Sequence, residues 1–370
     1  MTASISAVPR SMGASPIMVA GPDRSGTTLL YALLASHPNV AMVRRTNVWR
    51  YFYRRYGDLA DERNLERCLH DMLRFKRLRH LEPNGPGIRA AFHAGAPTYG
   101  GLFEAFYAQH AQRVGRRRWG DKSLHTEHYA GSVFGEFPDA RIIHMVRDPR
   151  DRYASARKRH GRDRPRVGGI TARWLLSTRR ALDNVARHGS GYLIVRYEDL
   201  VQDPIATLTR VCEFVGEPFD ERMLVMDGAT AYRDRGGNSS FGDVRGDAIS
   251  TTAVGRFRAV LSPSEIAFIQ TVAGREMAAL GYEPVPSGLH GRARTRYLVV
   301  GLPVQFARMI GWTAVARLWL RRGERIPPAK LQDELLEAAG ERPATGATSA
   351  AGSIAVASPA SGAPPAQAEP

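Results

Sequence analysis

A short turn bounded by two glycines, near the start of the chain, constrains the fold more than any other feature. Residues 17–34 read IMVAGPDRSGTTLLYALL: an apolar run, a turn from Gly21 to Gly26, and a second apolar segment. The first run predicts a buried strand, and the second predicts a helix whose first amide groups face the turn. Free N–H groups and the positive end of a helix dipole attract phosphate or sulfate. The pattern therefore predicts an α/β domain that binds an anion after its first strand.

The turn departs from the nucleotide P-loop at one important position. Gly21 and Gly26 have the P-loop spacing, but Thr27 stands where the lysine belongs and Arg24 lies inside the turn. The P-loop lysine is the group that reaches the β- and γ-phosphates of ATP. An ATP-dependent small-molecule kinase is therefore a weaker match than a protein whose ligand carries a differently placed anion.

The segment GPDRSGTTLL resembles the 5′-phosphosulfate loop of sulfotransferases that use 3′-phosphoadenosine 5′-phosphosulfate (PAPS), in the arginine-containing form of bacterial and tyrosylprotein members. The resemblance implies a three-layer α/β/α fold with a central parallel sheet. It also implies PAPS as the co-substrate and no metal. The loop residues that it implies as ligands are Arg24, Ser25, Gly26, Thr27 and Thr28.

A second stretch, RWGDKSLHTEHY at residues 118–129, brings a lysine, two histidines and two carboxylates together. Lys122 resembles the sulfotransferase lysine that lies near the transferring sulfuryl group. Cytosolic members of the family carry a histidine base two residues after that lysine, whereas here the first histidine is His125, three residues on. His125 is our candidate general base, and Glu127 and Asp121 remain alternatives.

A third stretch predicts the other end of a nucleotide site. Residues 142–146 predict a buried strand that ends in Arg147, and an Asp-Pro pair then opens a helix that carries Ser155 two turns along. The carboxyl ends of parallel strands are where open α/β sheets bind ligands. Arg147 and Ser155 resemble the family's 3′-phosphate motif. The resemblance further implies that Tyr197, in YEDL, contacts the nucleotide base and that Arg256, in VGRF, closes over a phosphate.

The charge of the chain indicates acidic ligands or an acidic surface as partners. Lys and Arg number 52 against 36 Asp and Glu, which gives a formal net charge of +16 carried mainly by arginine. Residues 43–58 interleave five arginines with aromatic residues. This segment has two interpretations: a pocket wall for an anionic, partly apolar acceptor, or a helix with its aromatics in the core and its arginines in solvent.

The pattern along the chain predicts the domain layout. The segments are a flexible N-terminus at 1–15, a sulfotransferase domain at 16–284, a helical extension at 285–339 and a disordered tail at 340–370. Residues 83–97 are rich in glycine and proline and predict a loop, and residues 226–252 predict a long functional loop that acts as a gate.

The extension predicts an apolar helix that does not cross a membrane. Arg308 and Arg317 interrupt the apolar stretch, and Pro303 is expected to break it. We expect residues 297–325 to contact a membrane surface, a second copy of the chain or their own domain. The first fifteen residues lack the apolar core of a secretory signal. The sequence therefore predicts a cytoplasmic location, free or peripheral at the inner membrane face.

The function that these motifs predict is sulfuryl transfer from PAPS to a hydroxyl group of a carbohydrate, a lipid or a small molecule. The sequence does not choose among these acceptors. A basic nucleic-acid-binding protein would explain the net charge of +16, but no nucleic-acid-binding module accompanies it. The kinase and the nucleic-acid-binding protein remain as alternatives.

Overall fold

The computed structural model describes residues 15–159, 166–234, 237–238 and 249–322. The disordered tail predicted at 340–370 and nearly all of the predicted flexible N-terminus lie outside these residues. Within them, one parallel sheet carries the fold. Its strands are β1 (Ile17–Ala20), β2 (Val40–Arg44), β3 (Arg118–Lys122), β4 (Arg141–Val146) and β5 (Tyr192–Arg196). They are ordered β2-β3-β1-β4-β5 and every neighbouring pair is parallel.

Helices occupy most of the remaining described chain. The longer ones are α1 (Thr27–Ala35), α3 (Glu62–Arg74), α4 (Gly85–Ala94), α5 (Tyr99–Arg113), α7 (Pro149–Arg159), α8 (Val167–His188), α10 (Pro204–Val215), α14 (Pro263–Ala279) and α16 (Leu302–Arg322). The short ones are α2 (Val48–Tyr51), α6 (Ala130–Glu136), α9 (Tyr197–Gln202), α11 (Arg222–Val225), α12 (Thr230–Arg233), α13 (Phe257–Val260) and α15 (Gly291–Arg296). Five further turns are η1 (Arg79–Leu81), η2 (Thr126–His128), η3 (Gly189–Gly191), η4 (Asp227–Ala229) and η5 (Tyr297–Gly301).

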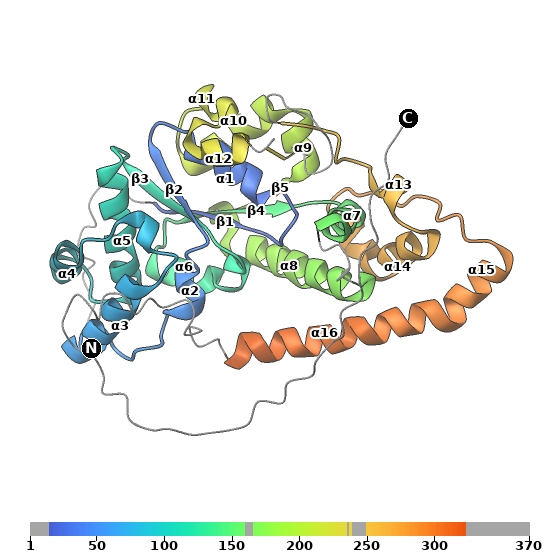
Figure 1. Ribbon diagram of the computed structural model, residues 1–370, viewed down its shortest axis with the longest axis horizontal. Helices are drawn as coiled ribbons and strands as arrows, with labels where there is room; N and C mark the ends of the chain where they lie inside the picture. Colours follow the sequence, from blue (N-terminus) through green and yellow to red (C-terminus); the bar gives the residue numbers. More distant parts are fainter. Residues whose placement is uncertain (1–14, 160–165, 235–236, 239–248, 323–370) are drawn as a thin grey trace, which may run out of the picture. The chain divides into compact units, whose positions relative to one another are not determined.

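The strand pattern divides the core into two layers because successive strand residues point to opposite faces. Met18 and Ala20 of β1 belong to a buried cluster with side chains of α3, α5 and α6. Ile17 and Val19 belong to a cluster with side chains of α1, α9 and α10. Figure 1 shows the sheet between these two sets of helices. The three-layer α/β/α fold predicted from the sequence is confirmed.

Gly21 lets the chain turn sharply after β1. Its φ is +123°, and a Cβ atom there would lie 2.4 Å from the carbonyl oxygen of Met145 on β4. An L side chain rarely adopts this conformation, and here it would also collide with the neighbouring strand. The glycine therefore fixes the path from β1 to α1.

Two loop predictions were wrong in part. Residues 85–94 form α4, because the Asn84 side chain accepts a hydrogen bond from the Gly87 amide and Pro86 sits in the first turn, where its missing N–H costs nothing. Within the predicted gate, η4 and α12 are helical, and the Gly228 amide donates to Ser36 after α1. Residues 235–236 and 239–248 of the gate lie outside the described chain.

Pro303 does not break the C-terminal helix. Residues Gly291–Leu318 form one helix, long and apolar enough to cross a membrane by length and composition. The π-helical turn η5 ends two residues before the proline. Wider turns of this kind accommodate the hydrogen bond that a proline removes. The helix packs along α8 of its own domain, as one of the predicted arrangements requires.

We expect Gly21→Ala to lower the free energy of unfolding by about 2 kcal/mol or more, through positive φ and the contact with Met145. Gly274→Ala is the matched control, because Gly274 lies inside α14 with no atom within 4 Å of an added Cβ. That variant should gain roughly 0.5–1 kcal/mol. Urea denaturation measures both, and equal effects would contradict the assigned role of Gly21.

Candidate active site

The candidate site lies at the carboxyl end of the sheet. The turn after β1, the Lys122 end of β3, Arg147 after β4 and Tyr197 after β5 all lie at this edge, because the strands are parallel. Most of the residues predicted from the three motifs therefore come together. Gly26, one of these residues, comes directly before α1 and has a φ of +84°. A Cβ atom added there would lie 2.5 Å from the Tyr197 ring.

Arg24, Arg147 and Ser155 form one connected group. The Arg24 Nε atom donates to Ser155 Oγ at 2.9 Å, and Arg147 Nη1 donates to the Arg24 carbonyl oxygen at 3.3 Å. Arg147 and Ser155 are both buried. The turn after β1 and the start of α7 are thus joined through the residues predicted to bind the two ends of one nucleotide.

The ring of Tyr197 completes this group. The Arg147 guanidinium lies over it, 4.4 Å from its centroid, and the Tyr197 hydroxyl accepts a hydrogen bond from Asn238. Arg147 Nη2 donates at 2.7 Å to the carbonyl oxygen of Ala253, next to the VGRF segment. That segment, which includes Arg256, is held because Asp151 of α7 accepts from the amides of Gly255 and Phe257.

Two buried polar atoms in this group have no hydrogen-bond partner among the described residues. They are Ser25 Oγ in the turn and Arg147 Nε. A buried donor without a partner costs free energy, and functional sites retain such atoms for a ligand. Both belong to residues predicted to bind phosphate or sulfate, so the donor set fits an anion at each position.

Arg152 is a supporting residue that the sequence motifs did not identify. Its side chain is fully buried, its Nε donates to the Asp23 carbonyl oxygen, and its Nη2 lies 2.5 Å from Asp23 Oδ1. A third bond runs from Nη1 to the carbonyl oxygen of Ile170 on α8. Arg152 therefore fastens the turn to α7 and α8. Its position in the sequence, between Arg147 and Ser155, was the signal that could have identified it.

Lys122 points from the end of β3 toward the first turn of α1. Its Nζ atom donates to Thr28 Oγ1, in the first turn of α1, at 3.5 Å. Burial, together with the neighbouring Arg45, lowers the pKa of Lys122 to about 8. A buried ammonium group beside other cations favours a bound anion, because the negative charge of the anion offsets the repulsion among the positive charges.

Asp121 supports the end of β3 and is buried there. It is 1% exposed, and its Oδ2 accepts hydrogen bonds from the hydroxyls of Thr46, Ser123 and Tyr107. Burial raises the pKa of Asp121 to about 6, against the lowering effect of those hydroxyls. The hydrogen bonds join the ends of β2 and β3, so this carboxylate is placed to position the site.

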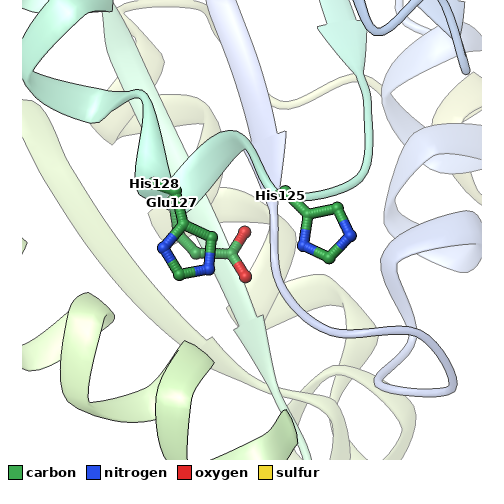
Figure 2. Close-up of side chains that lie close together, drawn as sticks. All are labelled: His125, Glu127 and His128. Carbon is green, nitrogen blue, oxygen red and sulfur yellow. The ribbon is translucent and has the colours of Figure 1, made fainter. Parts of the chain in front are cut away.

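His125, Glu127 and His128 lie close together just after β3. Their potential ligand atoms lie within 4.8 Å of one another, and Figure 2 shows the Glu127 carboxylate and both rings directed toward a common space. His125 adopts a φ of +67° and is exposed to solvent. The spacing would also admit a metal ion, so the expectation that no metal is needed stays a prediction.

Glu127 is the buried member of this group. Ser177 of α8 donates to its Oε1 at 2.7 Å, and Asn184 donates to its carbonyl oxygen. Burial alone would raise the pKa of Glu127, but His128, His144 and His125 outweigh it and hold the pKa at about 2. The carboxylate is therefore ionised at every ordinary pH and provides a fixed negative charge beside the imidazoles.

Desolvation by the surrounding protein lowers the pKa of His125; Glu127 opposes the shift, and Arg50 and Arg173 add to it. A lowered pKa keeps the imidazole neutral at pH 7, which is the form that accepts a proton. The imidazole is exposed, whereas Glu127 and Asp121 are buried and each has one carboxylate oxygen hydrogen-bonded to a hydroxyl group.

The aromatic residues of segment 43–58 pack into the core. Trp49, Tyr51 and Phe52 are almost fully buried, and Trp49 meets Phe103 edge to face. The interpretation of this segment with aromatics in the core therefore holds for these three residues. Of the arginines in this segment, Arg45 lies near the site, because its charge contributes to the lowered pKa of Lys122.

Comparison with known proteins gives the class. The profile of the sulfotransferase family matches residues 16–221. This range is more than half of the chain and contains the turn after β1, Lys122, His125, Arg147 and Ser155. The chain belongs to the sulfotransferase family.

The individual relatives share less than 30% sequence identity with the chain. Human carbohydrate sulfotransferase 2 is 29% identical over 40% of this chain and 36% of its own length, and rat carbohydrate sulfotransferase 1 is 27% identical over 40% of each. The chain thus matches little more than a third of the length of these curated relatives. The sulfotransferase domain of a Synechococcus olefin synthase covers 74% of this chain and 98% of its own, with 23% identity and a TM-score of 0.51. That likeness concerns the fold.

The prediction of a cytoplasmic location was wrong. The curated relatives that the chain matches are carbohydrate sulfotransferases, and the described chain contains a helix long and apolar enough to cross a membrane. The prediction failed because it rested on the composition of the first fifteen residues alone and on the assumption that Pro303 interrupts the C-terminal helix.

Asp121→Asn tests the raised pKa of this buried carboxylate. Because folding raises the pKa of Asp121 from 3.8 to about 6, the folded state binds more protons, and stability falls as pH rises between these values. The variant should lose this component and gain up to about 3 kcal/mol at pH 7. Urea denaturation from pH 4 to 7 measures it, and an unchanged pH dependence would contradict the assignment.

Proposed function

We propose that this sulfotransferase uses PAPS as donor and transfers its sulfuryl group to a hydroxyl group of a carbohydrate. The observation that carries the proposal is the connected group of Arg24, Arg147 and Ser155, with Lys122 on the other side of the same turn. These residues offer cations to both ends of a nucleotide that carries an anionic group at each end, and hydrogen bonds connect Arg24, Arg147 and Ser155.

The turn supplies the 5′ end of the site. The amides of Ser25 to Thr28 lie at the start of α1, where the first N–H groups have no partner in the helix. Arg24, the Thr27 and Thr28 hydroxyls and Lys122 add donors around them. These groups are fixed before the ligand arrives, so they need no reorganisation to stabilise charge.

Arg147 and Ser155 supply the 3′ end. Ser155 Oγ accepts from Arg24, which leaves its own O–H to donate, and Arg147 Nε has no partner among the described residues. Two such donors match a phosphate group and distinguish a 3′-phosphorylated nucleotide from ATP. Tyr197 and Arg256 are proposed to close this end, beside the base and the phosphate.

In the reaction, the bond from sulfur to the 5′-phosphate oxygen breaks while the acceptor oxygen bonds to sulfur. His125 accepts the acceptor proton, and Glu127 stabilises the imidazolium that forms. Negative charge grows on the departing phosphate, where Lys122 and the turn amides meet it. The adenosine 3′,5′-bisphosphate product (PAP) then leaves.

The carbohydrate acceptor rests on the matched relatives, which are carbohydrate sulfotransferases. A screen of sugars, lipids and phenols with PAPS, read by mass spectrometry for the gain of one sulfuryl group, tests it. The kinase alternative lacks the P-loop lysine, and family membership disfavours both it and a nucleic-acid-binding function.

Arg147→Ala should separate PAP from adenosine 5′-monophosphate in calorimetry. Wild type should bind PAP in the micromolar range and far more tightly than the monophosphate or ATP. The variant should bind PAP roughly 100-fold more weakly, because about 3 kcal/mol of charged hydrogen bonding is lost. Arg187→Ala, an exposed arginine on α8, is the control. Equal binding of ATP and PAP by wild type would contradict the assignment, and loss of both adenosine ligands would indicate misfolding.

The pH profile of kcat/KM for PAPS should fall above pH 8, by about tenfold per pH unit. The pKa of Lys122 is lowered to about 8, so its positive charge is lost as pH rises through that value. Lys122→Arg keeps the charge to higher pH and should move this limb upward by a unit or more. A limb that stays at pH 8 in the variant would assign it to another group.

A further inference from the structure

The helix formed by η5 and α16 has one face packed and one face exposed. On its inner side, Gly168 of α8 comes so close that an added Cβ would lie 2.4 Å from the carbonyl oxygen of Gln305. Met309 and Thr313 line the same side, facing α8 and α14. The helix is thus fixed to its own domain along its length, as Figure 1 shows for its course beneath α8.

The opposite side carries apolar side chains without polar ones among them. At 100° per residue, the positions farthest from the packed face are 300, 303, 304, 307, 310, 311, 314, 315 and 318. We call this stripe the outer face, and its large exposed members are Val300, Val304, Ile310, Val315 and Leu318, with exposures of 55, 41, 54, 49 and 43%. Over 18 residues it extends about 27 Å. A continuous apolar strip of this length on a surface marks an interaction site.

The charges beside the outer face are all positive. Arg308 and Arg317 lie at its two edges, and residues 284–323 contain seven arginines and no acidic residue. Arg292, Arg294 and Arg296 of α15 are exposed just before the helix. An apolar stripe with arginines along its edges fits a bilayer surface, where hydrocarbon receives the stripe and anionic headgroups receive the arginines.

We propose that the outer face of α16 docks the domain on an anionic lipid bilayer, with the helix lying in the plane of the surface. A spanning orientation would require the packed side, including the contact between Gly168 and Gln305, to leave its domain. A second copy of the chain fits less well, because an isologous pair would bring the arginines of two helices together with no carboxylate on either.

An apolar groove adds support for hydrocarbon as the partner. A cavity of about 680 Å³ opens between α8, α14 and α16, and Leu175, Val272 and Phe306 are among its walls. Phe306 is also 45% exposed and leads from the groove to the outer face. Lipid chains at the surface would therefore meet apolar protein on both sides of Phe306.

Docking would also bring the candidate active site near the bilayer. Arg173 of α8 lies over the Trp312 ring, 4.9 Å from its centroid, and its charge acts on the pKa of both His125 and Asp23. A single residue, Arg173, thus lies between the packed side of α16 and groups of the candidate active site. The proposal itself does not depend on the proposed reaction.

Vesicle sedimentation tests the proposal on the full-length protein. Wild type should bind vesicles of phosphatidylcholine with 30% phosphatidylserine at least tenfold more tightly than pure phosphatidylcholine vesicles, and 0.5 M NaCl should weaken this binding. Val304→Glu with Val315→Glu should reduce binding at least tenfold. Ile205→Glu with Val225→Glu is the matched control, because these apolar side chains are equally exposed on α10 and α11. It should bind as wild type does.

Arg308→Gln with Arg317→Gln should reduce the preference for anionic vesicles by roughly tenfold while leaving the thermal unfolding midpoint unchanged. Three results would overturn the proposal: no binding by wild type, an equal loss in the control pair, or binding without dependence on phosphatidylserine. A dimer by light scattering that the Val304 and Val315 substitutions dissociate would instead assign the outer face to a second copy.

Discussion

The hydrogen bonds that tie the turn after β1 to α7 are the constraint on which the site depends. Arg152 is fully buried, and burial lowers its pKa, so its charge is tolerable only because Asp23 accompanies it. Arg24 and Ser155 make a second link between the same two segments. The strand order places these segments side by side, and the two links then hold them at hydrogen-bonding distance from each other.

The sequence was sufficient for the sheet and its motifs because each rests on local chemistry. Strand ends, the turn after β1 and the Arg147–Ser155 junction all follow from apolar runs, glycine spacing and helix capping. Arg152 was missed because its partner, Asp23, is 129 residues away and only the fold brings them together. Helix α4 was missed for another reason: glycine and proline were taken as loop signals, although Asn84 and Pro86 formed a start signal.

The site contains ionisable groups whose pKa values are all lowered, which has opposite effects on the charges of its acidic and basic members. Glu127 is held ionised by neighbouring histidines, while Lys122 and His125 are shifted toward their neutral forms. Proton affinities of this kind come from three-dimensional neighbours and cannot be deduced from spacing. The sequence could name His125, Glu127 and Asp121 as candidate bases, but it could not show that the two carboxylates are buried and bonded to hydroxyl groups while His125 is exposed.

Gly168, at the contact between α8 and α16, limits which amino acids this position of the sequence can carry. Because the backbones of α8 and α16 touch there, any residue larger than glycine would act as a wedge and lift the C-terminal helix from the domain. That helix contributes no ligand to the predicted nucleotide pocket. One added carbon at this contact would therefore act first on the attachment of the helix, and on the site only through the neighbouring Ile170 and Arg173 of α8.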